Sequence, residues 1–113
     1  MMWIMVAGPY RSGSDNPVRW SENLRELNQV ALEIFQRGHI PIIGVNLALP
    51  VIDVAGQEMY SELMMPISLA LAERCDAVLR IGGASSGADR EVERFRAKGL
   101  PIFRSIDEIP TPT

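Results

Sequence analysis

The chain is predicted to fold as a flavodoxin-like α/β protein, a three-layer sandwich with a parallel sheet of four or five strands. It has 113 residues, of which 47% are hydrophobic and 22% charged, the balance of one soluble domain. Its short apolar runs do not alternate with polar residues, as expected of strands covered on both faces. The segments between these runs have helical period, and alternating strands and helices favour an open sheet with right-handed crossovers.

The strands are expected at 3–7, 40–45, 77–81 and 101–103. A first helix is expected over 17–37, because Asn16 is a good N-cap, Pro17 suits the first helical position and Gly38 suits the end.

Two further helices are expected, over 57–74 with an interruption at Pro66 and over 87–98. No repeat or composition shift divides the chain. We therefore expect a single domain over 1–109, followed by a frayed tail over 110–113.

Prolines predict the order of the strands. Pro41 lies inside the second strand and Pro101 opens the fourth, and proline is tolerated at sheet edges and strand starts. The predicted order is therefore 2-1-3-4, with strands 1 and 3 in the centre. Ligands of such sheets bind beyond the carboxyl ends of the strands, where the strand order reverses. The Gly- and Ser-rich loops 8–13 and 82–87 should line one cleft there.

Composition excludes several classes of function. The net charge of −3 argues against a nucleic-acid partner, which would need a basic face. A single cysteine, Cys75, excludes a Cys-based zinc cluster, and a single histidine, His39, excludes a His-rich metal site. Because the candidate cleft residues offer only one carboxylate, no metal is expected, and no cofactor is expected either. No apolar run has the length of a membrane span and no signal peptide is recognised, so we expect a cytoplasmic protein without a membrane partner.

The loop after the third strand is a candidate anion site. Ser85, Ser86 and Gly87 lead into the predicted helix, and the free N–H groups and dipole of a helix N-terminus favour negative charge. A purely structural interpretation competes with this one, because 86–89 also resembles a loose capping box.

Glu91 is the candidate catalytic carboxylate. At helical period Ala88, Val92 and Phe95 face the sheet, and Glu91 is the acid nearest this apolar stripe. Its position in the second turn directs it over the carboxyl edge of the sheet, where burial raises the pKa and the helix N-terminus favours the ionised form. The alternative is a solvated glutamate paired with Arg94 or Lys98.

Three more candidates lie on other segments. Tyr10 and Arg11 directly follow the first strand, where a guanidinium could neutralise a phosphate or simply lie at the surface. Asn46 ends the predicted second strand, a position that often faces a ligand, although turn-forming asparagine is the commoner explanation.

Two motifs resemble the nucleoside 2-deoxyribosyltransferase superfamily, and within it a small bacterial branch without assigned function. One is AGPYRSG over 7–13, after the first strand. The other combines CDAVLRI over 75–81 with SSGADRE over 85–91. The similarity covers most of the chain, and the superfamily also contains the deoxynucleoside 5′-monophosphate N-glycosidases.

The resemblance implies a nucleophile at Glu91 and a phosphate-binding serine at Ser85 or Ser86. It also implies phosphate recognition around the first loop, which contains Gly8, Pro9, Arg11, Ser12 and Gly13. The chain departs from the family at two positions. The family has a tyrosine inside the first strand, for which Tyr10 substitutes only if the loop folds back, and an aspartate where Ser68 stands here.

We therefore expect a hydrolase or transferase that acts on the N-glycosidic bond of a (deoxy)nucleoside or its 5′-monophosphate through Glu91. Two alternatives stay open: a nucleotide-binding module without catalysis, favoured by Ser68, and a structural or partner-binding subunit. A homodimer is also expected, because 57–74 is richer in methionine and leucine than one small sheet face requires.

Overall fold

A computed structural model describes residues 1–112 and contains a four-stranded, wholly parallel sheet. The strands are β1 (Trp3–Ala7), β2 (Ile40–Ile42), β3 (Ala77–Arg80) and β4 (Ile102–Phe103). Their order is β2-β1-β3-β4, which confirms the predicted order and the flavodoxin-like fold. Met5 of β1 pairs with Ile42 on one side and Val78 on the other.

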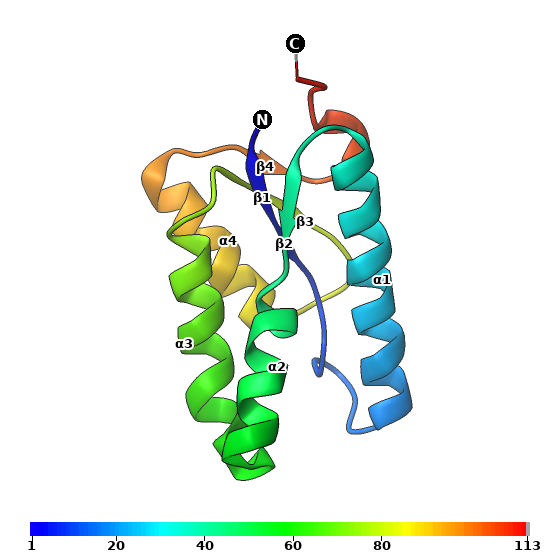
Figure 1. Ribbon diagram of the computed structural model, residues 1–113, viewed down its shortest axis with the longest axis vertical. Helices are drawn as coiled ribbons and strands as arrows, with labels where there is room; N and C mark the ends of the chain where they lie inside the picture. The colour runs from blue at the N-terminus through cyan, green and yellow to red at the C-terminus, as the bar shows by residue number, and fades with distance from the viewer. Residues whose placement is uncertain (113) are drawn as a thin grey trace.

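Helices cover both faces of this sheet, so the three-layer arrangement is confirmed (Figure 1). The helices are α1 (Pro17–Gln36), α2 (Gly44–Ala55), α3 (Tyr60–Ala72) and α4 (Ser86–Lys98), with 3-10 turns η1 (Gln57–Met59) and η2 (Ile106–Glu108).

Alternate residues of the central strands supply two cores. Ile4 and Val6 of β1 pack towards α1, against Leu27 and Ile34. Their neighbours Met5 and Ala7 face the opposite way, and the core on that side contains Val92 and Phe95 of α4. Successive side chains of a strand point to opposite faces of the sheet. Because both faces are buried here, every residue of β1 is apolar, which explains its continuous apolar run.

Helix α2 is the main difference from the expected elements. The second strand ends at Ile42 instead of 45, and α2 begins at Gly44 in a stretch for which no helix was expected. The stretch offers few signals of a helix: no side chain caps its N-terminus, it is apolar on most sides, and Pro50 lies inside it. Helix α3, in contrast, continues through Pro66 without ending there.

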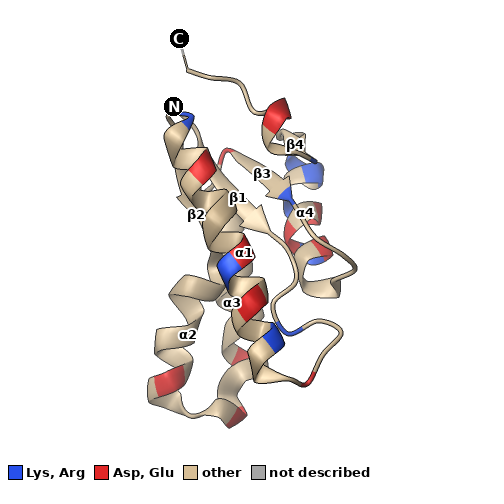
Figure 2. Cartoon of the chain, turned by 90° about the vertical axis from the view of Figure 1, so that its right-hand side faces the viewer, with Lys and Arg blue, Asp and Glu red and all other residues tan. Residues whose placement is uncertain are grey.

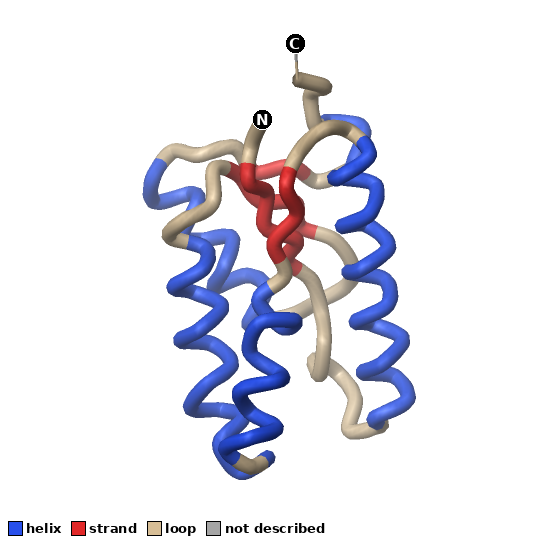
Figure 3. The backbone as a smooth tube through the Cα atoms, in the orientation of Figure 1, coloured by secondary structure: helices blue, strands red, loops and turns tan. Residues whose placement is uncertain are grey.

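Helices α2 and α3 pair beyond the carboxyl ends of the strands and lengthen the molecule, which measures 44 × 26 × 24 Å (Figure 3). The two helices come close together where Gly44 meets Ser68. A β-carbon at position 44 would lie 2.7 Å from Cβ of Ser68 and 3.1 Å from its Cα. Glycine at 44 therefore lets the start of α2 approach the backbone of α3.

The capping residues were partly predicted. The Asn16 side chain accepts a hydrogen bond from the backbone N–H of Val18, 3.0 Å away. At α4 the cap is Ser85, whose Oγ accepts from the N–H of Ala88 at 3.2 Å, so the predicted capping box starting at Ser86 is wrong by one residue.

Two side chains accept hydrogen bonds from backbone N–H groups at the amino end of β1. Asp76 Oδ2 accepts from the N–H of Trp3 at 2.8 Å, and His39 Nδ1 accepts from the N–H of Met2 at 3.0 Å. The other ring nitrogen of His39 lies 2.6 Å from the carbonyl oxygen of Pro110. The predicted fraying of 110–113 stays a prediction, and Thr113 lies outside the described residues. Within 1–112, no helix is both long and apolar enough to cross a membrane.

Candidate functional site

A cleft of about 200 Å³ opens at the carboxyl ends of β1 and β3. Seven residues predicted from the sequence line it: Gly8, Tyr10, Arg11, Ser12, Ser85, Gly87 and Glu91. The two Gly- and Ser-rich loops therefore meet, as the strand order predicts. A direct hydrogen bond from the Ser12 hydroxyl to Ser85 Oγ, 2.9 Å long, joins them.

Four predicted residues lie outside this lining. Asn46 does not end a strand; it lies on α2, is exposed, and donates from Nδ2 to Asn28 Oδ1 at 2.7 Å. Gly13 and Ser86 are exposed, and Pro9 packs beside Gly82, where an added β-carbon would lie 2.7 Å from Pro9 Cδ.

The N-terminus of α4 faces the cleft. Ser85 is buried and caps the helix, while Gly87 and Ala88 of its first turn line the cavity. The unpaired N–H groups of a first turn, together with the helix dipole, favour an anion. The hydroxyls of Ser12 and Ser85 add two polar atoms at the same edge.

Glu91 is the buried acid of the cleft. The residue is 8% exposed, and burial raises the pKa of its carboxyl to about 8, against which the positive charge of Arg80 lowers it. The alternative of a solvated, paired glutamate is wrong, because Arg94 and Lys98 both contact Glu73 instead. A carboxyl with this pKa exists in both protonation states near neutral pH, which suits proton transfer or nucleophilic attack.

Arg11 lies at the mouth of the cleft in an aromatic cage that sequence reasoning did not foresee. Its guanidinium carbon is 3.7 Å from the ring centroid of Tyr60 and 4.2 Å from that of Trp20. Nη2 donates to Gln57 Oε1 at 3.1 Å, whereas the buried Nε finds no hydrogen-bond partner within residues 1–112. The stacked rings restrict the guanidinium, and they leave Nε as a buried donor that no group within residues 1–112 satisfies.

The opposite wall comes from helices α2 and α3 and was largely missed. It consists of Val45, Tyr60, Met64, Met65 and Ser68. Ser68 is 2% exposed, and its hydroxyl has only the Met64 sulfur nearby, at 3.9 Å. Only the family resemblance had drawn attention to Ser68. Nothing local in the sequence indicates that Tyr60 meets Arg11, because 48 intervening residues separate them.

The lining offers a single carboxylate, Glu91, and no group of three or more His, Cys, Asp or Glu residues within 1–112 is arranged to hold a metal ion. The site can therefore supply one buried carboxyl, a caged guanidinium and a helix N-terminus. These groups suit an organic substrate that carries a negative charge.

Comparison with known proteins adds evidence for the fold. No family model matches the chain, and no curated protein is similar to it in sequence. Among solved structures, it resembles a 2-deoxyribosyltransferase from the psychrotolerant bacterium Bacillus psychrosaccharolyticus, with a TM-score of 0.62 and 17% sequence identity. The similarity covers 88% of this chain and 69% of that one, and it supports a deoxyribosyltransferase-like fold.

Proposed function

We propose that the protein cleaves or exchanges the N-glycosidic bond of a (deoxy)nucleoside or its 5′-monophosphate, with Glu91 as nucleophile. The observation that carries this proposal is a buried carboxyl at the junction of two loops that can hold an anion. The solved structure that the chain resembles is described as a 2-deoxyribosyltransferase, which agrees with this class of reaction.

In the proposed reaction the Glu91 carboxylate attacks C1′ of the sugar. A C–O bond forms, the C1′–N bond breaks, and the base leaves with the bonding electron pair and takes up a proton. Water or a second base then attacks C1′ from the opposite side and loses a proton, which balances the one taken up by the first base, and Glu91 is released as a carboxylate. Two displacements retain the anomeric configuration. Because only the ionised carboxyl is nucleophilic, turnover should rise with pH up to about pH 8.

Glu91→Gln is expected to lower base release by at least about 1,000-fold, since the amide cannot form the glycosyl ester. The measurement is chromatography of free base from a panel of nucleosides and 5′-monophosphates. Methanol added as an acceptor should give the methyl glycoside with retained configuration. Glu93→Gln is the matched control, because Glu93 is exposed on the same helix and contacts Arg96. An inverted product, or full activity of Glu91→Gln, would contradict the proposal.

Arg11 is proposed to hold a 5′-phosphate together with Ser12, Ser85 and the first turn of α4. Arg11→Met keeps much of the apolar stem of the side chain and removes the guanidinium. We expect it to reduce kcat/KM for monophosphates by about 100-fold and for nucleosides much less, since binding of the remote phosphate orients C1′. Equal losses for the two substrate classes would show that Arg11 acts only on the shape of the cleft.

A nucleotide-binding module without catalysis is the second candidate, and the observation that favours it is Ser68. Ser68 is buried and carries a hydroxyl at the position where the nucleoside 2-deoxyribosyltransferase superfamily, which the sequence resembles, has an aspartate. The cleft therefore has only one carboxylate, that of Glu91. In this case nucleotides would raise the melting temperature while no free base appears. The same panel of compounds, tested by thermal shift and by chromatography, separates the two functions.

We also propose that the protein acts in the cytoplasm as a homodimer. Exposed apolar side chains lie on α1 (Leu32 and Phe35) and on α2 (Leu47, Val51 and Val54). Asp53 is the one charged residue of α2, which is otherwise drawn without charge in Figure 2. The expected interface thus involves α1 and α2, whereas Met64 and Leu69 of α3, on which the sequence-based expectation rested, are buried.

Light scattering after size exclusion should give about twice 12.5 kDa for the wild type. Val51→Glu combined with Val54→Glu should give the monomer mass, because two charges on an apolar contact would be desolvated. Lys98→Glu, on the distant α4, is a control for the change in net charge. A monomeric wild type at micromolar concentration would disprove the dimer.

A further inference from the structure

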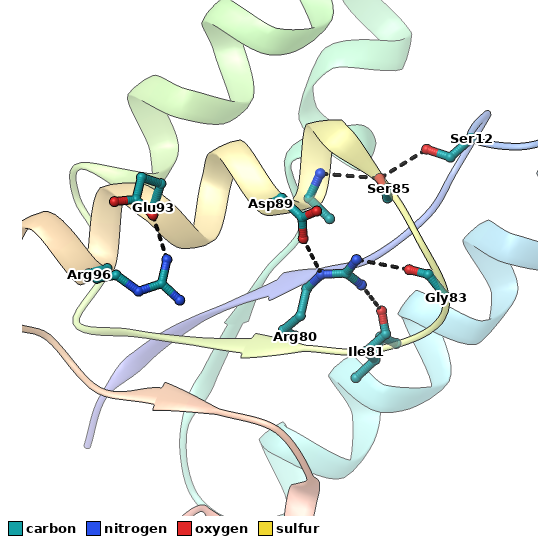
Figure 4. A network of polar contacts seen from close by, with 9 residues as sticks. Ser12, Arg80, Ile81, Gly83, Ser85, Asp89, Glu93 and Arg96 are labelled. Carbon is teal, nitrogen blue, oxygen red and sulfur yellow. Dashed lines mark hydrogen bonds and ion pairs between the residues drawn. The ribbon is translucent and has the colours of Figure 1, made fainter.

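Arg80 is the last residue of β3, and its side chain lies between this strand, the loop that follows it and the start of α4 (Figure 4). Its side chain is only 9% exposed. It shares the α4 side of the sheet with Val78, because strand residues two apart point to the same face. A guanidinium does not lose its proton in proteins, so the chain keeps a permanent positive charge at this buried position.

The Arg80 guanidinium forms hydrogen bonds with the backbone of the loop that follows β3. Nη1 donates to the carbonyl oxygen of Ile81, and Nη2 donates to that of Gly83 at 2.8 Å. Nε forms an ion pair with Asp89 Oδ1, in the first turn of α4, at 3.3 Å. One side chain therefore ties the beginning of the loop to the helix that follows it.

This loop determines where the cleft residues of α4 lie. Gly82 adopts a φ of +77°, which favours glycine, and the loop then delivers Ser85 to its capping position. Ser85 also receives the hydrogen bond from Ser12 of the opposite loop. Glu91 follows Ser85 by fewer than two turns of the same helix, so a shift of the loop would move the carboxyl as well.

Arg80 also acts on Glu91 through its charge. Burial raises the pKa of the Glu91 carboxyl to about 8, and Arg80 is the group whose charge lowers it. Other titratable groups near Glu91 include Cys75, ahead of β3, whose thiol pKa is raised by burial and by the charges of Asp76 and Glu91. They also include the cleft residues Tyr10, Arg11 and Tyr60. The ion-pair partner of Arg80, Asp89, is largely exposed and compensates the buried charge only weakly.

We propose that Arg80 is a positioning residue for Glu91, which holds the loop 81–85 and the first turn of α4 in place and supplies a fixed positive charge at the start of that helix. Arg80 does not line the cleft and so acts without touching the substrate. The assignment of Glu91 as nucleophile rests on the proposed function, but the effect of Arg80 on the ionisation of Glu91 does not.

The first test is therefore independent of activity. The side-chain carboxyl of Glu91 is followed by ¹³C NMR during a pH titration and assigned by the loss of its signal in Glu91→Gln. We expect Arg80→Met to raise the midpoint of the Glu91 titration by about one pH unit, because it removes the positive charge that lowers the pKa of this carboxyl. Arg96→Met is the matched control, since it removes an exposed guanidinium from α4 and should leave the midpoint unchanged.

Arg80→Lys separates the effect of the positive charge from the effect of the hydrogen bonds to the loop. It also replaces Arg80→Met as the test if that variant does not fold. Lysine keeps the positive charge but cannot donate to both carbonyls and to Asp89 in a fixed plane. The midpoint should stay within a few tenths of a pH unit of wild type, while hydrogen exchange of the backbone amides 82–89 becomes at least several-fold faster. A wild-type exchange rate in Arg80→Lys, or an unshifted midpoint in a folded Arg80→Met, would overturn the proposal.

Where base release is detected, the pH profile gives a second readout. The rise of kcat with pH should move to higher pH in Arg80→Met by the shift seen in the NMR titration, with KM changed less than kcat. If no substrate is turned over, the proposed function fails while the titration still decides the role of Arg80. A kcat profile that stays in place although the NMR midpoint moves would exclude Glu91 as the ionising group of catalysis.

Discussion

Glu91→Gln is expected to make the protein more stable above about pH 8, with a melting temperature higher by at least about 4 °C. Burial raises the pKa of this carboxyl from an ordinary 4.5 to about 8, so the folded protein binds a proton that the unfolded chain has already released. Between these two values the free energy of unfolding falls as pH rises. The difference between the two pKa values corresponds to at most about 4–5 kcal/mol of stability that the wild type loses as the pH rises. Glutamine has no proton to release, so the variant does not lose this stability.

The measurement is the melting temperature of wild type and variant from about pH 4.5 to about pH 9. The difference between the two should be small at the acidic end, grow up to about pH 8 and then stay constant. Glu93→Gln removes an exposed carboxyl from the same helix and should show no such growth. A stabilisation by Glu91→Gln that does not depend on pH would mean that the carboxyl is not desolvated.

Gly44→Ala is expected to destabilise the protein by about 2–4 kcal/mol, because α2 and α3 touch at this point. The new methyl group would lie 2.7 Å from Cβ of Ser68 and 3.1 Å from its Cα. Backbone cannot give way as the end of a flexible side chain can, so the two helices must move apart. Val45 and Ser68 both line the cleft, so its wall should move too.

Chemical denaturation measures this loss, and two further variants identify its cause. Ser68→Gly removes the Cβ and the hydroxyl that the methyl group meets, so it should restore part of the stability to Gly44→Ala despite the cost of glycine in a helix, about 1 kcal/mol. Gly83→Ala is the control, since an added β-carbon there meets nothing within 4 Å. Equal losses at positions 44 and 83 would show that close helix contact is not responsible.

Much of the Glu91 site can be predicted from the pattern of neighbouring residues in the sequence. The position of Glu91 beside the apolar stripe of Ala88, Val92 and Phe95 placed it at the sheet, and the structure buries all four residues. Pro41 of β2 and Pro101, directly before β4, predicted the strand order, and this order brings the two loops together. These inferences succeed because helical period, strand burial and proline chemistry are properties of neighbouring residues.

Helix α2 and the surroundings of Arg11 cannot be predicted from the pattern of neighbouring residues. The stretch 44–55 has no capping side chain, contains Pro50 and is apolar on most sides, so its helix is stabilised by packing against α3. The partners of Arg11, Trp20 and Tyr60, come from α1 and α3.

Local sequence pattern therefore predicts the sheet, its strand order, the two loops and the acid between them. It does not predict the second wall of the cleft, the aromatic cage of Arg11 or the degree to which Glu91 is desolvated. Each of these three features depends on groups that are distant in sequence. Their contacts follow from the way that α2 and α3 pack on each other beyond the sheet, which no local periodicity encodes.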